Sequence, residues 1–295
     1  MNSFSKYSWL VTSLTLLIGF VLLHFEIISY GIGFFIAFPL SLGFSIGTMT
    51  KDIRKYLSIS LGIVSFSGVL ILIGWEGFFC VVIALPILFL STVIGFYASR
   101  WFRQKRKTKW LRSSIVPFIV LLSIDTLEKM VLPEPQLVEV ENSIVLDYPA
   151  TQVFHAVKKM DTLNAPKPWA LQIGLPTPYK CILASDTVGS KRTCLFSNGQ
   201  IVAEITKYEV GEVLEMDVVS YSLTGRDWFE FVDAKYLFSE QDGKTKITRT
   251  SSYKSSLQPR AYWEPFEKWG IAQEHKFVLN SLKKNLAKMK KEDEN

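Results

Sequence analysis

The chain has 295 residues, 48% of them hydrophobic, and its 33 Lys and Arg outnumber its 27 Asp and Glu to give a net charge of +6. Residues 1–135 hold 12 basic and 6 acidic residues, which leaves 21 of each for residues 136–295. The basic excess sits in short loops between apolar segments. It therefore indicates membrane topology and argues against nucleic-acid binding.

The first 100 residues contain four long apolar segments. These are Trp9–Ile28, Ile32–Thr48, Leu57–Trp75 and Phe78–Ala98. A helix of 20 residues is about 30 Å long, the thickness of the hydrocarbon core, so each segment predicts a membrane-spanning helix. The first is too long for a signal peptide, and no small-residue cleavage site follows it.

A fifth apolar segment, Trp110–Leu132, is interrupted by charged residues. An Asp in the middle of a membrane costs about 2.5–3.5 kcal/mol on insertion scales, so Asp125 weighs against a spanning helix. We predict that this segment spans, and a helix lying on the membrane surface is the alternative. The other charged residues in it are Arg112, Glu128 and Lys129.

Loop charges predict the orientation of these helices. Basic residues follow the second and fourth segments, whereas the turns after the first and third hold only Glu26 and Glu76. The positive-inside rule then places the N-terminus and both basic loops in the cytoplasm. With five spans the C-terminal domain is extracytoplasmic, and with four it is cytoplasmic. The basic loop residues are Lys51, Arg54, Lys55, Arg100, Arg103, Lys105, Arg106, Lys107 and Lys109.

The character of the chain changes near Pro133, which gives a division into four parts. Residues 1–132 form a multi-pass transmembrane domain, 133–137 a linker, 138–291 an α+β domain and 292–295 an acidic tail. The α+β domain opens with a strand, because polar and apolar residues alternate over residues 138–146. A short helix follows Pro149. Its apolar stripe is Val153, Phe154, Val157 and Met160.

From Tyr179 the pattern predicts a meander of about six strands. Asn198-Gly199 and Asp242-Gly243 are hairpin signals. The first pairs Phe196 with Ile201, and the second pairs Tyr236 with Arg249. A long helix, Pro265–Lys291, ends the domain. Its apolar stripe is Ile271, His275, Val278, Leu282, Leu286 and Met289.

Several phrases in this order resemble the START/Bet v1-like superfamily, also called SRPBCC or polyketide cyclase/dehydrase-like. They are IVLDYPATQVF (144–154), VGSKRT (188–193), FSNGQ (196–200), TKYEVGE (206–212) and the helix 269–282. The resemblance covers about residues 136–290, and in particular it is similar to a bacterial subgroup with membrane helices in front. It implies a helix-grip fold, in which a curved antiparallel sheet surrounds a long C-terminal helix and leaves a cavity for apolar ligands. It carries over no catalytic residue.

The predicted strand registers bring one set of side chains to the face that meets the helix. Charged members of this set must be paired, and Glu230 with Arg249 is a candidate pair. Either these groups orient a ligand headgroup, or they lie at the rim or pair as scaffold. The candidate ligand-binding residues are Arg192, Phe196, Trp228, Glu230, Tyr236, Arg249, Tyr253 and His275.

Catalytic and metal chemistry have little support in the sequence. His275 is a weak candidate for proton transfer, since a lone His on an apolar helix face is more often a core residue. The three cysteines form no CxxC and no Cys/His cluster, so no metal or other cofactor is expected. A turn at Thr187-Val188 places Cys181 opposite Cys194, which would form a disulfide in an exported domain and remain thiols in the cytoplasm.

The sequence therefore favours a membrane-anchored module that binds a lipophilic small molecule, as carrier or sensor. Its expected partners are membrane lipids and that ligand. The alternatives are a cyclase- or dehydratase-type enzyme acting on an apolar substrate, and a scaffold that docks a partner. An enzyme needs a convergent acid–base set, and the sequence shows no nucleotide loop or Ser/His/Asp arrangement, so an enzyme is the less favoured interpretation.

Overall fold

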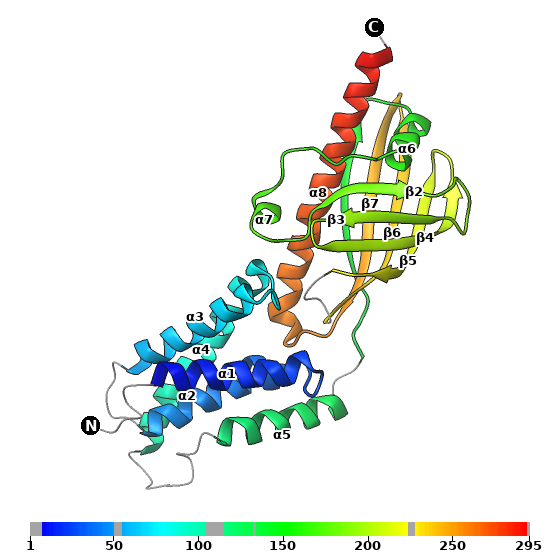
Figure 1. Ribbon diagram of the computed structural model, residues 1–295. Helices are drawn as coiled ribbons and strands as arrows, with labels where there is room; N and C mark the ends of the chain where they lie inside the picture. The colour runs from blue at the N-terminus through cyan, green and yellow to red at the C-terminus, as the bar shows by residue number, and fades with distance from the viewer. Residues whose placement is uncertain (1–7, 50–54, 104–114, 132–133, 224–227, 294–295) are drawn as a thin grey trace. The chain divides into compact units, whose positions relative to one another are not determined.

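A computed structural model describes residues 8–49, 55–103, 115–131, 134–223 and 228–293 (Figure 1). The chain divides into two compact units. The first is Met1–Glu134 with Ser256–Trp263, and the second is Pro135–Ser255 with Glu264–Asn295. Most of the basic loop residues, the start of the Trp110–Leu132 segment, part of the linker and the end of the acidic tail lie outside the described residues.

The first unit is helical. Its helices are α1 (Ser8–His24), α2 (Phe38–Met49) with the π-helical turn η2 (Gly33–Ala37) before it, α3 (Lys55–Leu72), α4 (Phe78–Arg103) and α5 (Val116–Val131). α1 packs against α3, and α2 packs against α4 and α5. The short segment Ser256–Trp263 also belongs here: the Gln258 amide donates to the Tyr30 carbonyl at 2.9 Å, and the Trp263 and Phe35 rings lie 4.7 Å apart.

One described helix, Phe78–Trp101, is long and apolar enough to cross a membrane, with a mean hydropathy of 2.6. Three other helices are apolar but shorter, namely Trp9–His24, Gly33–Thr48 and Tyr56–Leu72. Length and composition therefore support one spanning segment among the described residues, where the sequence predicts four or five.

Glycines let α2 and α4 approach closely. A Cβ added at Gly43 would collide with the carbonyl oxygen of Thr92, and one at Gly95 would collide with that of Leu40. A Cβ at Gly47 would collide with the Ser99 hydroxyl. Larger side chains at these positions would force the two backbones apart.

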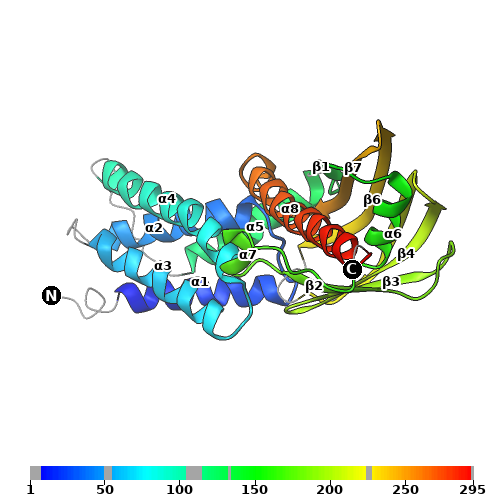
Figure 2. The ribbon, with the colours of Figure 1, turned by 90° about the horizontal axis from the view of Figure 1, so that it is seen from above.

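The described residues of the second unit form a seven-stranded antiparallel sheet and the helices α6, α7 and α8. Its order is β1-β7-β6-β5-β4-β3-β2, so the first strand pairs with the last. The long helix α8 lies along the concave face of this sheet (Figures 1 and 2). This is the helix-grip architecture that the resemblance implied. The elements are β1 (Val138–Leu146), α6 (Ala150–Lys158), α7 (Trp169–Gln172), β2 (Pro178–Leu183), β3 (Lys191–Phe196), β4 (Gly199–Glu209), β5 (Val213–Tyr221), β6 (Phe229–Gln241), β7 (Lys244–Ser255) and α8 (Arg260–Asp293).

The two predicted hairpins differ in how well their registers agree with the structure. The β6–β7 register is as predicted, with Tyr236 opposite Arg249. In the β3–β4 hairpin Phe196 instead pairs with Gly199, so Ser197 and Asn198 form the turn. Because this shift is two residues, it leaves every side chain on its predicted face.

A bulge in β6 reverses part of the predicted pattern. The register shifts between Phe231 and Asp233, so that Phe231 rather than Val232 joins the face of Tyr253. Upstream of a bulge the alternation of faces changes by one residue. Glu230 is consequently exposed, and its predicted place on the inner face is wrong.

The core of the second unit lies between α8, α6 and the sheet. The α6 stripe is fully buried, and on α8 the predicted stripe is buried from His275 to Leu286, whereas Met289 is 36% exposed. Leu214 and Met216 of β5 complete the core from the sheet side. The interior is therefore apolar over most of its length, apart from a small group of polar side chains.

Candidate functional site

Two arginines and a tyrosine form the centre of the buried polar group. Arg192 projects from β3, Tyr236 from β6 and Arg249 from β7, all toward the interior. The guanidinium carbon of Arg192 lies 5.9 Å from the centroid of the Tyr236 ring, and that of Arg249 lies 5.6 Å from it. At these distances both cations are attracted by the ring face.

Arg249 has a carboxylate partner on α8. Its Nη2 lies 3.1 and 3.0 Å from the two carboxylate oxygens of Glu274. Burial lowers the pKa of Arg249, but the charge of Glu274 and the Tyr236 ring more than offset this and raise it. The sequence predicted Glu230 as the partner, and that pairing is wrong because Glu230 is exposed.

Arg192 has no carboxylate of the described chain within ion-pair distance. Its Nη2 donates to the carbonyl of Val157, in the last turn of α6, at 2.9 Å. Only 3% of the residue is exposed. Burial and the charge of Arg249 lower the pKa of Arg192, while Tyr236 opposes them.

Neither guanidinium is fully hydrogen-bonded. The buried Nε and Nη1 atoms of Arg192 and of Arg249 have no hydrogen-bond partner among the described residues. Buried donors without acceptors are uncommon in folded proteins and require an explanation. In the described part of the second unit, these four nitrogen atoms are the buried side-chain donors left without a partner.

His275 lies next to this cluster within a chain of three polar side chains. Its Nδ1 is 3.1 Å from Oδ1 of Asn142 on β1, and its Nε2 is 2.9 Å from Oγ of Ser251 on β7. With Nδ1–H donating to Asn142, Nε2 accepts from the Ser251 hydroxyl. Burial, aided by the charge of Arg249, lowers the pKa of His275 to about 2.

Ser251, His275 and Asn142 follow one another in the order of a nucleophile, a base and an orienting residue. An effective general base has a pKa near the working pH, however, and a group with a pKa of about 2 takes no proton near neutrality. The geometry instead gives both ring nitrogens a partner, as a core histidine requires. Asn142 and Ser251 were not predicted as site residues, although both occupy inward positions on their strands.

The remaining predicted residues do not join the cluster. Tyr253 is fully buried in a second, smaller core with Phe229, whose ring stacks on it at 4.7 Å, and Trp228 packs against the same core. The Tyr253 hydroxyl donates to Glu267 at 3.1 Å. Phe196 is half-buried at the end of β3. Of the eight predicted residues, Arg192, Tyr236 and Arg249 meet directly, with His275 beside them.

Cys181 and Cys194 form a disulfide between β2 and β3. They are paired in the strand register, with their Cα atoms 4.0 Å apart. β2 is an edge strand, so the disulfide joins the edge of the sheet to the neighbouring strand.

Within the described ranges, no group of three His, Cys, Asp or Glu side chains is placed to hold a metal ion.

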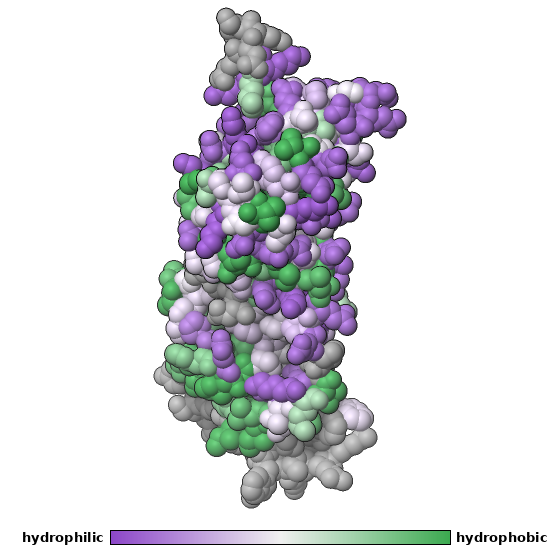
Figure 3. Space-filling model, turned by 90° about the vertical axis from the view of Figure 1, so that its right-hand side faces the viewer, coloured by the Kyte–Doolittle hydropathy of each residue, from purple (hydrophilic) through white to green (hydrophobic). Residues whose placement is uncertain are grey.

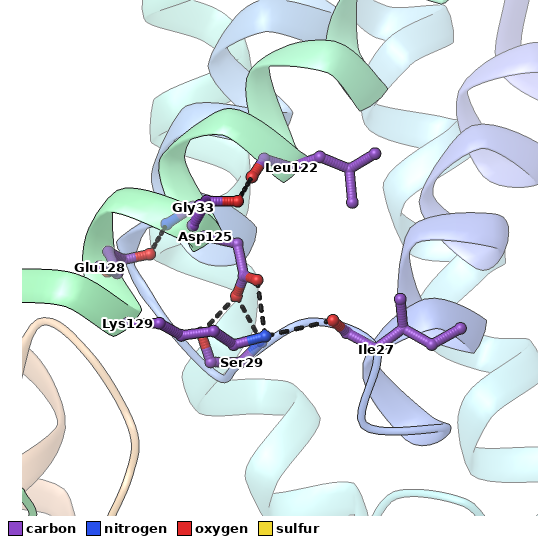
Figure 4. A network of polar contacts seen from close by, with 8 residues as sticks. Ile27, Ser29, Gly33, Leu122, Asp125, Glu128 and Lys129 are labelled. Carbon is purple, nitrogen blue, oxygen red and sulfur yellow. Dashed lines mark hydrogen bonds and ion pairs between the residues drawn. The ribbon is translucent and has the colours of Figure 1, made fainter.

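A second buried polar cluster lies in the first unit (Figure 4). The carboxylate of Glu128 on α5 accepts from the amides of Ile32 at 2.7 Å and Gly33 at 2.8 Å. Asp125 accepts from the amide of Ser29 at 2.6 Å and pairs with Lys129 at 2.8 Å. The charges that interrupt the fifth apolar segment thus bind the loop between α1 and α2.

No protein-family model and no curated protein matches this sequence. Among solved structures, that of Ara h 8.0201 matches 52% of this chain and 99% of its own length at 10% identity, with a TM-score of 0.37. TTHA0849 from Thermus thermophilus matches 52% and 99% at 9% identity and a TM-score of 0.40. Ms6760 from Mycobacterium smegmatis matches 53% and 99% at 14% identity and a TM-score of 0.38.

Proposed function

We propose that this chain is a membrane-anchored module that binds a lipophilic small molecule inside its helix-grip unit, between α8 and the sheet. The observation that carries the proposal is the distribution of polarity in that interior. It is apolar over most of its length, and its incompletely bonded polar groups gather around Arg192, Tyr236 and Arg249. An apolar lining with a few convergent polar groups is typical of small-molecule sites.

The first unit would serve as the anchor. Its helices bury hydroxyl side chains, including Thr12, Thr92 and Ser99, which are all fully buried, while Leu61 and Leu90 are 54% and 60% exposed. Hydrophobic side chains also form patches on the visible surface of these helices, with polar side chains between them (Figure 3). Membrane helices typically have small and polar residues where they contact one another, and apolar residues on their outer surface.

A tether to the bilayer would hold the binding unit where lipophilic molecules are concentrated. Four spans, or five with α5, would agree with the loop charges. Helices of about 17 residues lie at the short end of the range that spans a bilayer. α1 has 17 residues and α3 has 18.

Binding is favoured over catalysis because the acid–base chain at His275 is fully engaged within the core. The imidazole is neutral and has partners on both nitrogens. Ser251, which would have to act as the nucleophile, is only 5% exposed. These features oppose the cyclase or dehydratase alternative.

Site-resolved photo-crosslinking of the full chain in lipid nanodiscs tests the proposal. Photoreactive derivatives of a long-chain alcohol and a long-chain acid would be added in turn, and labelled peptides identified by mass spectrometry. We expect labelling of inward-facing peptides of β4, β5 and α8, for example around Ile205, Met216 and Phe277. Labelling confined to residues 1–134 with both probes would reject ligand binding and favour a scaffold role.

A further inference from the structure

The polar cluster around Tyr236 holds more positive than negative charge. Arg192 is buried and the Arg249 side chain is only 12% exposed, and Glu274 is the one described carboxylate that pairs with either of them. His275 is neutral. One positive charge is therefore left without a counter-ion among the described residues, and a buried charge without a partner is strongly unfavourable.

The buried N–H donors without hydrogen-bond partners belong to these same two arginines. Arg192 uses Nη2 for the Val157 carbonyl and Arg249 uses Nη2 for Glu274, and the Nε and Nη1 atoms of both remain without partners in the described chain. Both guanidinium groups lie within 6 Å of the Tyr236 ring centroid. Donors from β3 and β7 thus gather beside one ring, with apolar side chains such as Ala203 and Ile205 in the same core.

We infer that the bound molecule is an amphiphile with a singly charged anionic headgroup, such as a carboxylate, which is held by Arg192 and Arg249 beside Tyr236. This inference rests on the proposed function and adds the chemical class of the ligand. The anion supplies the missing charge and acceptors for the unbonded N–H groups, and such charge-assisted hydrogen bonds are about twice as strong as neutral ones. We expect the tail to lie among the apolar side chains of this core.

A purely structural role accounts for only part of the geometry. Arg192 stabilises the end of α6 through Val157, since a cation there also interacts favourably with the helix dipole. Arg249 joins α8 to the sheet through Glu274. Each role uses Nη2 alone, and each leaves Nε and Nη1 buried and unbonded.

Competition binding to the full chain in nanodiscs tests the inference. Labelling of the interior by the photoreactive acid would be displaced with decanoate, decanol or acetate. We expect decanoate to compete about tenfold better than decanol, because it alone brings a negative charge to the two guanidinium groups. Acetate should compete poorly because it lacks the tail.

Three variants make the test specific. Arg192→Met should abolish most of decanoate's advantage over decanol, and Glu274→Gln should increase it, because the variant removes a carboxylate that competes for Arg249. Lys246→Met removes the same charge from the solvent-facing side of β7 and should leave the advantage unchanged. Labelling by the photoreactive alcohol shows in each variant whether the interior is intact.

The outcomes separate this inference from the proposed function. Equal competition by decanoate and decanol in the wild-type chain would overturn the anionic headgroup and leave lipophilic binding standing. Competition by acetate as strong as that by decanoate would overturn the amphiphile in favour of a small-anion site. If neither photoreactive probe labels the interior, the proposed function itself fails. The wild-type comparison stands even if Arg192→Met does not fold.

Discussion

The neutral imidazole of His275 gives the second unit a specific dependence on pH. In the unfolded chain a histidine has a pKa of about 6.5, whereas burial and Arg249 lower the pKa of His275 to about 2 in the folded chain. Below pH 6.5 the unfolded state therefore binds a proton that the folded state does not. The contribution of His275 to the free energy of unfolding is therefore complete above pH 6.5 and is lost as the pH falls toward 2.

We predict that replacing His275 with Gln reduces this acid sensitivity. The wild-type unit should lose about 1.4 kcal/mol of unfolding free energy per pH unit below about 6.5 from this residue alone. Pulse proteolysis in urea at pH 7.5 and 5.5, performed on the full chain, measures the difference between the two proteins. Equal losses in both would show that His275 does not titrate as described.

At the residue scale, strand alternation predicts part of the candidate site. Arg192, Tyr236 and Arg249 lie on the inner face because a two-residue register shift in one hairpin preserves it and the other register is as predicted. Glu274 could not be found in the same way. It lies beside the apolar stripe of α8 and pairs with Arg249 there, a tertiary contact with no local signal. The bulge that exposes Glu230 likewise depends on packing between strands.

At the scale of elements, Glu128 attaches α5 to the start of the η2–α2 helix. We predict that Glu128→Ala weakens this attachment by about 1–3 kcal/mol, the cost of leaving buried amides without an acceptor. Thr126→Ala, at an exposed position of the same helix, is the matched control. Hydrogen exchange of the amides of Ile32 and Gly33 measures the effect, and equal exchange in the two variants would contradict the assignment.

The sequence indicated where α5 is charged but not which way those charges face. Pro117, Leu121, Asp125 and Glu128 are buried together, at spacings of four, four and three residues. The carboxylates thus occupy the packed stripe of the helix. Gly31 fits this arrangement, because a Cβ there would collide with Glu128.

The disulfide acts on the β2–β3 hairpin at the edge of the sheet. It joins cysteines 13 residues apart, and a loop of about 15 residues gains about 3 kcal/mol from such a cross-link in the chain-entropy model. We predict a loss of about 2–4 kcal/mol in the Cys181→Ser, Cys194→Ser double variant. Urea unfolding by pulse proteolysis measures it, with Cys80→Ser as the control. A loss of similar size in the control would assign the effect to thiol removal in general.

At the scale of the whole molecule, composition alone predicts a helical apolar part followed by an α+β part. The assignment of Ser256–Trp263 to the first unit has no such signal. That segment has the pattern of an ordinary connection before a helix, and only its contacts with residues such as Tyr30 and Phe35 reveal the grouping. Sequence patterns report on local periodicity and burial, whereas this grouping depends on contacts between distant parts of the chain.

The disulfide also bears on which side of a membrane the second unit lies. Disulfides persist in oxidising compartments, so within the proposed membrane-anchored arrangement the Cys181–Cys194 bond would favour an extracytoplasmic second unit and the five-span alternative. We predict that a thiol introduced by Ser239→Cys, at an exposed position of β6, reacts with a membrane-impermeant maleimide in intact cells that express the chain. A Cys80→Ala background removes the remaining thiol outside the disulfide. Reaction only after lysis would place the unit in the cytoplasm, remove α5 from the spanning helices, and predict that Cys181 and Cys194 are thiols there.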